Sequence, residues 1–243
     1  MEILEKSLIK TSIILGIFLV IGVSIISFSM YQIKAADNSL AVTGSAKQSV
    51  TADIVKWNGN FSRTVYASGL KAGYTQMKAD EAIVLKFLKD NGIVDAELTI
   101  SPVSMQEQYN YNKTTGAPTE YILTQTVIIQ SSDIQKIQNI SKSTQTVIDQ
   151  GVIFSAYSPE YYYSKLPEMR VTLLPEAMKD AQTRAESIAK STGKKVGSLK
   201  SASMGVVQVL QPNSIDISDY GNYDTSTVEK EIMITVKASF SLR

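Results

Sequence analysis

The feature that most constrains the fold is an uncharged apolar stretch near the N-terminus. From Thr11 to Ile33 the chain has 23 residues without an acidic or basic side chain, and most of them are aliphatic or aromatic. At about 1.5 Å per residue, a helix of that length spans a hydrocarbon core of about 30 Å. Lipid offers no hydrogen-bond partner to the backbone, so the segment must satisfy its own amide groups as a helix. The stretch therefore predicts one transmembrane helix.

The residues that flank this stretch predict its orientation. Lys6 and Lys10 precede the span and Tyr31 lies just inside its far end, so we expect a cytoplasmic N-terminus, a single pass through the inner (cytoplasmic) membrane and an extracytoplasmic C-terminal domain. A cleaved signal peptide is the alternative, with Ser27 and Ser29 as the small residues before the cut. Both alternatives place the rest of the chain outside the cytoplasm. A buried core helix is disfavoured because the segment is apolar on all sides.

The remaining residues have the composition of a folded domain. The chain is 44% hydrophobic and 19% charged, and we divide it into residues 1–34 (cytoplasmic N-terminus and anchor), 35–39 (linker) and 40–243 (extracytoplasmic domain). Without the leader, 21 basic residues balance 21 acidic ones. Nucleic acid is therefore not an expected partner, and the short group Lys194, Lys195 and Lys200 is interpreted as a solvated helix end.

Two residue types are missing, and their absence excludes most familiar catalytic chemistry. The sequence contains no cysteine and no histidine. It therefore cannot build a thiol nucleophile, a serine–histidine–aspartate triad, a zinc finger or a histidine proton shuttle. We expect a protein that is not an enzyme, and we assign no catalytic, cofactor-binding or metal-binding residue.

Alternation of apolar and polar residues predicts strands with one exposed face. In residues 53–66, Val55, Trp57 and Phe61 share one parity while polar residues take the other. Gly59 interrupts the alternation and is expected to mark a bulge. Further strands are expected at residues 97–109, 121–130, from 152, at 159–165, 198–210 and 230–242. We expect a hairpin loop at residues 110–120 and a long, mobile polar loop at 212–227.

Helical periodicity predicts three amphipathic helices that end at glycines. They are expected from Leu70 to Asn91-Gly92, from Ser132 or Asp133 to Gly151, and from Pro167 or Pro175 to Gly193. The third helix carries alanines at four-residue spacing, which indicates that another element packs very close to it. The expected fold class is α+β, with mainly antiparallel sheets packed with these three helices and preceded by one transmembrane helix.

Three groups of residues are candidates for chemistry or binding, and each has a simpler structural interpretation. The acidic loop residues Asp216, Asp219 and Asp224, beside Asn213, Gly221 and Asn222, could ligate calcium, but their spacing favours a solvated polar loop. Glu176, Asp180 and Arg184 favour a charge row on a helix surface over a catalytic site. The tyrosines Tyr157, Tyr161, Tyr162 and Tyr163 favour packing on a sheet over a binding platform, and Tyr109 and Tyr111 are weaker interface candidates.

Several segments together resemble the SIMPL domain family. They are Val42-Thr43-Gly44 and Thr51-Ala52-Asp53 in the opening strands, Leu88 to Ser101, Tyr109 to Tyr111, Gly116 to Val127, Ala177 to Gly197 and Ser201 to Gln208. The resemblance covers residues 40–243. Ala52 departs from the family pattern, which usually has proline there. The family is similar to bacterial envelope proteins, including a periplasmic immunogenic protein that assembles into a ring-like channel and a protein linked to oxidative stress. It has no established catalytic residues.

This resemblance implies a membrane-anchored, non-enzymatic envelope protein that forms a homo-oligomeric ring, cage or channel-like assembly through sheet edges and the alanine-rich helix. An envelope-stress module that binds a ligand or partner without ring assembly is the alternative. A hydrolase that uses carboxylates alone is a third possibility. Gly16 and Gly22 lie six residues apart and do not form a close-packing G-x-x-x-G pair, so the helices are expected to tether the subunits without driving their assembly.

Overall fold

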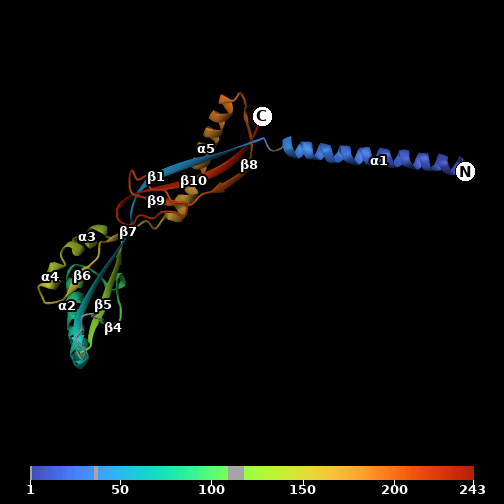
Figure 1. Ribbon diagram of the computed structural model, residues 1–243. Helices are drawn as coiled ribbons and strands as arrows, with labels where there is room; N and C mark the ends of the chain where they lie inside the picture. The colour runs from blue at the N-terminus through green and yellow to red at the C-terminus, as the bar shows by residue number, and fades with distance from the viewer. Residues whose placement is uncertain (1, 36–37, 109–117) are drawn as a thin grey trace. The chain divides into compact units, whose positions relative to one another are not determined.

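The computed structural model describes residues 2–35, 38–108 and 118–243. It begins with the helix α1, Glu2–Ala35, which contains the apolar stretch (Figure 1). Within α1, Ile13–Tyr31 has a mean hydropathy of 2.6 and none of it is buried. This helix is long and apolar enough to cross a membrane, although a signal sequence near an N-terminus has the same properties.

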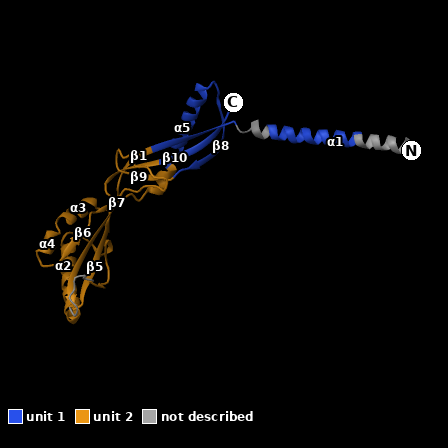
Figure 2. Ribbon diagram, in the orientation of Figure 1, with its two compact units in different colours: residues 1–46, 172–205, 234–243 blue, residues 47–171, 206–233 orange. Residues whose placement is uncertain are grey.

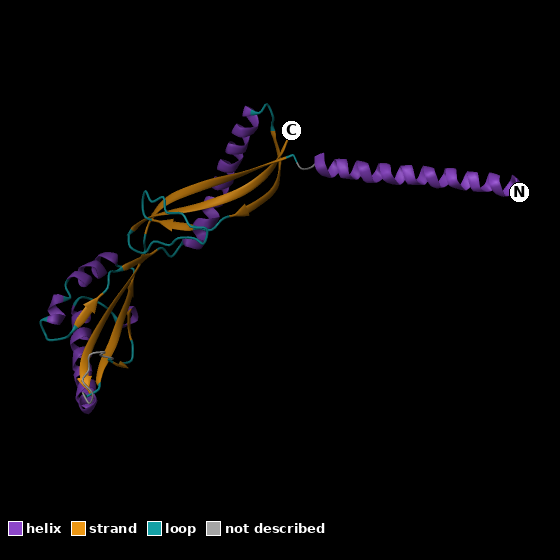
Figure 3. Cartoon of the chain, in the orientation of Figure 1, coloured by secondary structure: helices purple, strands orange, loops and turns teal. Residues whose placement is uncertain are grey.

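The rest of the chain is α+β with two antiparallel sheets, as expected (Figure 3). The first sheet has four strands in the order β1-β10-β8, with β9 also paired to β10. Its strands are β1 (Ser39–Thr51), β8 (Val196–Met204), β9 (Gln208–Leu210) and β10 (Glu229–Leu242). The second sheet has six strands in the order β3-β5-β2-β6, with β4 paired to β5 and β7 paired to β2. Its strands are β2 (Ile54–Tyr66), β3 (Leu98–Ile100), β4 (Ser104–Glu107), β5 (Glu120–Ser131), β6 (Phe154–Ala156) and β7 (Glu160–Tyr162).

Contacts divide the chain into two compact units, each built from separate segments (Figure 2). Unit 1 contains residues 1–46, 172–205 and 234–243, and unit 2 contains residues 47–171 and 206–233. The strands β1 and β10 and the helix α5, Leu166–Ser191, each have residues in both units. The family resemblance alone would treat these residues as one domain.

The helices follow the predicted glycine stops, with one difference. The helix α2 covers Leu70–Asp90, and the glycines Gly92, Gly151 and Gly193 all have positive φ. The second predicted helix is two helices, α3 at Ile134–Lys142 and α4 at Gln145–Ile148. Short 3₁₀ turns precede α2 (Ala67–Gly69) and β3 (Asp95–Glu97).

The break between α3 and α4 has a local cause. The Ser143 hydroxyl and the Ser143 N–H both donate to the Ile140 carbonyl, at 3.1 and 3.0 Å, which tightens the last turn of α3. The predicted start of α3 is confirmed, because the Asp133 carboxylate accepts the Lys136 N–H at 2.9 Å. The predicted start of α5 is confirmed only for Pro167, since Pro175 lies inside the helix.

In unit 2, the residues of β2 that were predicted to face inward do so. The bulge predicted at Gly59 is absent from this strand. Val55, Trp57 and Phe61 are fully buried, and the pairing of β2 with β5 continues without a shift through Gly59. A Cβ on Gly59 would lie 2.3 Å from the Phe154 ring. The glycine is there because an aromatic ring from β6 lies directly on the strand, which local alternation cannot predict.

In unit 1, the alanine stripe of α5 packs against β1, as its spacing predicted. Ala177, Ala181, Ala185 and Ala189 are at most 1% exposed. A Cβ on Gly44 in β1 would lie 2.3 Å from both the Ala177 carbonyl and the Ala181 nitrogen. The two backbones therefore touch, because neither element carries a side chain larger than a methyl group at the contact.

Two of the remaining predicted strands are each divided into two in the structure. The 97–109 strand is divided into β3 and β4, and both pair with β5 as a hairpin partner should. The 198–210 strand is divided into β8 and β9. Most of the hairpin loop, together with Tyr109 and Tyr111, lies outside the described residues. The predicted interface role of these two tyrosines therefore stays a prediction.

Candidate functional site

The last strand brings a lysine into the interior of unit 2. Lys230, the second residue of β10, is fully buried and shares the parity of Ile232. Its ammonium donates to the Asp224 carbonyl at 2.6 Å and lies 3.4 Å from the Asp224 carboxylate. It also lies 6.0 Å from the centre of the Tyr223 ring. The alternation of β10 already indicated that position 230 faces inward, but sequence reasoning did not extend the buried face to a charged residue.

Asp224 uses its carboxylate to fold its own loop. The carboxylate accepts the N–H groups of Ser226 and Thr227, each at 3.1 Å, and both of their hydroxyls. It also accepts the Gln211 side-chain N–H at 3.2 Å. Burial acts to raise the pKa of Asp224, but these hydrogen bonds outweigh it and hold the pKa well below its ordinary value. Burial lowers the pKa of Lys230, although the nearby carboxylate opposes the shift.

Backbone hydrogen bonds hold the long loop after β9 against β9, β7 and the connection between β1 and β2. Asp224 donates its N–H to Val209 at 2.8 Å, Tyr161 donates to Thr225 at 2.8 Å, and Ala52 donates to Val228 at 2.9 Å. The loop is as long as predicted, but these backbone bonds tie down its second half, which the sequence pattern did not indicate. A polar hollow of about 340 Å³ lies beside Asp224. The buried lysine does not reach solvent, so the pair is suited to holding the loop in place and not to meeting a substrate.

The other acidic residues of this loop do not join Asp224. Asp216 and Asp219 are exposed, and the side chain of Asn222 donates to the Asp216 carbonyl at 3.4 Å. Among the described residues, no group of three or more acidic side chains is placed so that it could hold a metal ion. Asn213 and Gly221 both have positive φ and serve the turns of the loop.

Tyr161 and Tyr162 lie on opposite faces of the sheet, as the alternation predicted. Tyr161 lies in the core of unit 2, whereas Tyr162 points to the other face of β7 and contacts the Tyr223 ring at 5.8 Å between centroids. The Tyr162 hydroxyl donates to Glu160 at 2.7 Å, and this bond raises the pKa of Tyr162 to about 12. Tyr163 donates its N–H to the Tyr223 hydroxyl at 2.9 Å. Tyr157 is exposed, and its carbonyl accepts the Trp57 indole N–H at 2.9 Å.

The predicted charge row on α5 is present only in part. Arg184 pairs with Asp180 one turn earlier, with 2.8 Å between guanidinium and carboxylate. The same Asp180 oxygen accepts the Ser45 N–H of β1 at 2.8 Å, so this carboxylate joins the helix to the neighbouring strand. Glu176 is exposed.

A partly buried ion pair in unit 2 was not predicted. Arg63 of β2 makes two parallel hydrogen bonds with Asp80 of α2, at 2.7 and 2.8 Å, and a third with the Gly151 carbonyl at 2.8 Å. The side-chain hydrogen bond to Asp80 raises the pKa of Arg63, and Asp80 is only 2% exposed. No local pattern links these residues, since they lie on different elements. The pair fixes a helix, a strand and a turn to one another.

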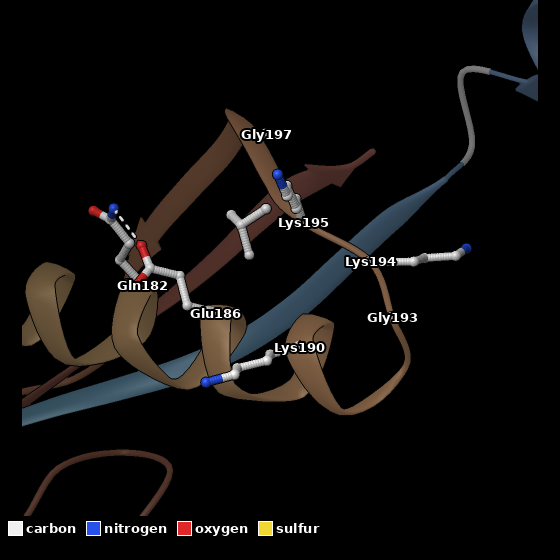
Figure 4. Close-up of a pocket in the computed structure, with 8 residues that line it drawn as sticks. Gln182, Glu186, Lys190, Gly193, Lys194, Lys195 and Gly197 are labelled. Atoms are coloured by element: carbon white, nitrogen blue, oxygen red, sulfur yellow. Dashed lines mark hydrogen bonds between the residues drawn. The ribbon is translucent and has the colours of Figure 1, made fainter.

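Unit 1 has a hollow at the end of α5. It has a volume of about 570 Å³ and is lined by Gln182, Glu186 and Lys190 of α5 and by residues 193–197. Figure 4 shows Gln182 bonded to Glu186 on the helix, and Lys194 and Lys195 on the segment that follows it. All three lysines of this hollow are exposed. Two of them belong to the group that the sequence interpretation assigned to a solvated helix end, whereas Lys200 lies on β8.

The strand β8 forms one edge of the first sheet. Its partner is β10, in the register Ser203 with Lys237 and Ala202 with Ala238. In the described part of the chain no other strand pairs with β8. Every side chain from Ser198 to Met204 is exposed. The strand therefore offers an open row of backbone donors and acceptors.

The comparisons with known proteins bear on both units. The family described as "SIMPL: Protein of unknown function (DUF541)" matches residues 40–240, which begin in β1 and end in β10. The apolar helix α1 precedes the matched region. No curated protein matches the sequence.

Proposed function

Since the chain belongs to the SIMPL family, whose description assigns no function, we propose from its geometry that it is a membrane-anchored envelope protein without enzymatic activity that assembles with copies of itself through the free edge of β8. The anchor is α1, with its N-terminus in the cytoplasm and the matched region outside. The single observation that carries the assembly is the open edge of β8, whose nine residues pair with β10 alone among the described strands.

The absence of enzymatic activity is supported by how the charged groups are used. The chain has no histidine or cysteine, and Lys230 with Asp224 and Arg63 with Asp80 are each committed to bonds within the fold. A general acid or base needs a lone pair or proton within reach of a substrate. Neither the buried Lys230 ammonium nor the saturated Asp224 carboxylate offers one.

Backbone alternation identifies which amide groups of β8 face the free edge. Gly205 donates its N–H to Thr235 of β10 at 2.9 Å. Because N–H groups of successive strand residues point to opposite sides, Ser203 also faces β10, whereas Ala202 and Met204 direct their N–H groups toward the free edge. A second chain could accept hydrogen bonds from these two positions.

The partner edge follows from the position of the anchor. Asn38 accepts the Leu242 N–H at 3.0 Å, and Lys195 and Arg243 exchange two backbone bonds. The first residues of β1 and β8 thus lie at the same end of the sheet as the end of β10, next to the anchor. Antiparallel pairing of β8 with β8 would send two anchors to opposite ends of the joint sheet, about 30 Å apart over nine residues.

Parallel pairing of β8 with β1 of the next copy keeps all anchors at one end. It is a head-to-tail contact, so it repeats from copy to copy and gives a ring where the rotation closes. The bond from Ser45 to Asp180 occupies one donor of β1, so we place the contact on the residues of β1 before Ser45. Confinement of α1 to one membrane raises the local concentration of the domains.

Proline at the free edge tests this proposal. Ala202→Pro removes an N–H that faces away from β10, so the sheet itself should persist while intermolecular pairing is lost. Native mass spectrometry of the full-length protein in detergent should show an oligomer for the wild type and for Ala202→Ser, and monomers for Ala202→Pro with unchanged circular dichroism.

Two further proline variants test whether loss of the oligomer is caused by loss of folding. Met204→Pro should behave as Ala202→Pro does, whereas Ser203→Pro removes a bond to β10 and should lower the melting temperature. A wild-type protein that is monomeric at micromolar concentration, or an Ala202→Pro protein that is folded and fully oligomeric, would contradict the assembly through β8.

A further inference from the structure

The length of the tether fixes one end of unit 1 near the membrane. The candidate span ends at Tyr31, α1 continues to Ala35, and β1 begins at Ser39. Four helical residues and three more residues, at the greatest length a chain can reach, span about 17 Å, so Asn38 lies within that distance of the end of the span for any orientation of α1. Unit 1 therefore cannot stand far from the headgroups if α1 is a retained anchor.

The residues at this end are basic. Leu242 bonds to Asn38, and the next residue, Arg243, exchanges backbone hydrogen bonds of 2.7 and 2.8 Å with Lys195. Lys194 precedes Lys195 in the turn after α5. The Arg243 guanidinium nitrogen lies 3.2 Å from the position of a Cβ on Gly197, so its side chain lies over the segment that lines the unit 1 hollow.

The charge of the two units supports a surface role for this end. The domain is neutral as a whole, but residues 38–46, 172–205 and 234–243 of unit 1 contain eight basic and three acidic residues. Unit 2 contains 13 basic and 17 acidic residues. The unit that carries the anchor is thus basic, whereas unit 2 is acidic.

The lining of the hollow has the same sign. It contains Lys190, Lys194 and Lys195 against the single acidic residue Glu186. Glu186 also accepts a hydrogen bond from Gln182 at 2.9 Å. Each ammonium group carries three hydrogen-bond donors, and the hollow of about 570 Å³ has room for a phosphate group.

We propose that the end of unit 1 formed by Lys190, Lys194, Lys195 and Arg243 binds the phosphate headgroups of anionic phospholipids. These lipids belong to the leaflet from which the C-terminal end of α1 emerges, next to unit 1. The inference rests on the retained anchor of the proposed function and not on the assembly through β8. The tether is short enough to keep this end of unit 1 beside the membrane surface, where these residues can contact the lipid phosphates directly. Headgroup binding would then set how unit 1 stands on the membrane.

Lysine labelling on the full-length protein tests the proposal. The protein is reconstituted into vesicles of phosphatidylcholine alone or with one third phosphatidylglycerol, treated with an amine-reactive acetylating reagent and analysed by mass spectrometry. Acetylation of Lys194 and Lys195 should be about threefold slower in the anionic vesicles. Lys179 and Lys237, exposed residues of the same unit, should react equally in both. Salt at about 1 M should remove the protection because it shortens the Debye length to about 3 Å.

A pair of matched double variants separates the site from general charge. Lys194→Gln with Lys195→Gln should abolish the protection of Lys190 in anionic vesicles. Lys179→Gln with Lys237→Gln removes the same charge from the same unit and should leave it intact. Equal loss of protection in both double variants would show a diffuse charge effect and overturn the site.

Two further results would also overturn the proposal. Vesicle flotation distinguishes them from a failure of α1 to anchor the protein in the membrane. The same acetylation of Lys194 and Lys195 in both vesicle types would exclude headgroup binding. Equal protection by inorganic phosphate with phosphatidylcholine vesicles would identify a free-anion site. Vesicle flotation after a high-salt wash reports the anchor independently: protein that floats without lysine protection refutes the inference alone, whereas protein that does not float refutes the anchor on which it rests.

Discussion

At the scale of single residues, Lys230 shows how a strand can bury a charge. The strand dictates that position 230 faces the interior, and the long side chain reaches the Asp224 carbonyl and carboxylate from there. Removing one partner of such a pair lowers the free energy of unfolding by more than the net contribution of the intact pair. The reason is that the remaining charge stays buried in a medium of low dielectric. Asp224 is the more informative residue to change because it also holds Ser226 and Thr227.

We predict that Asp224→Asn lowers the free energy of unfolding by about 3 kcal/mol at pH 7, because it leaves Lys230 buried without a counter-charge. The wild-type pKa of Asp224 is depressed in the folded state, so its stabilisation is present above the unfolded value of 3.8 and is lost as pH falls below it. Urea unfolding of the two proteins from pH 7 to pH 3 measures the difference between their free energies of unfolding. This difference should be constant down to about pH 4 and should become smaller below that pH.

The matched control is Asp216→Asn in the same loop. Asp216 is exposed, so this change should alter the free energy of unfolding by no more than about 0.5 kcal/mol. If the free energies of unfolding of wild type and Asp224→Asn differ by the same amount down to pH 3, the carboxylate charge does not stabilise the fold.

The parity of these residues could be read from the sequence, but their contacts could not. Alternation correctly placed Val55, Trp57 and Phe61 inward on β2, and on β10 it gives the five buried residues Ile232, Ile234, Val236, Ala238 and Phe240. The same alternation includes Lys230, yet a lysine at an inward position is normally interpreted as an exposed strand end. Its partner Asp224 belongs to a loop whose path depends on bonds to two strands and to the connection between β1 and β2, and no local pattern encodes that path.

At the scale of elements, the contact between β1 and α5 depends on the smallest side chains. Gly44 meets the backbone of α5 at Ala177 and Ala181, and the helix itself carries only methyl groups along that line. The alanine spacing predicted close packing but could not identify the partner. Gly44 and Ala181 are 137 residues apart in sequence, and only the folded sheet brings them together.

We predict that Gly44→Ala destabilises the protein by about 3 kcal/mol, the upper end for overpacking. The new methyl group would lie 2.3 Å from backbone atoms of α5. No flexible side chain can move aside to make room for it, so the helix itself has to shift. Thermal unfolding followed by circular dichroism measures the effect. Thr43→Ala, at the exposed neighbouring position, should change the melting temperature little. A Gly44→Ala protein as stable as the wild type would show that α5 can move away from β1 at low cost.

Helix ends were easier to predict than helix continuity. Gly92, Gly151 and Gly193 adopt the positive φ that ends a helix, and the sequence shows them directly. The break at Ser143 depends on a hydroxyl that bonds back to Ile140, and a serine on a helix surface usually makes no such break. Periodicity therefore extended one helix across two.

At the scale of the whole molecule, the division into two units could not be predicted from the sequence. The sheet of β1, β10 and β8 joins residues from opposite ends of the chain, and β1 and β10 contribute to both units. Local patterns identify strands but not which distant strand each one pairs with. The opposite net charges of the units also become visible only once their segments are known, because the totals cancel over the domain.

The role of α1 leads to a prediction about the whole chain. If the interfaces lie on β8 and β1, deletion of Met1 to Ile33 should give a soluble protein that forms the same oligomer at sufficient concentration, because no interface residue is removed. The truncated protein should dissociate at higher concentrations than the full-length one, since it loses the confinement that the membrane provides. Sedimentation velocity over a range of concentrations, with the full-length protein in detergent as the control, measures both effects. Adding Ala202→Pro to the truncated chain should leave only monomers. A truncated protein that is monomeric at every concentration, beside an oligomeric full-length control, would show that the transmembrane helices supply the association and that β8 does not.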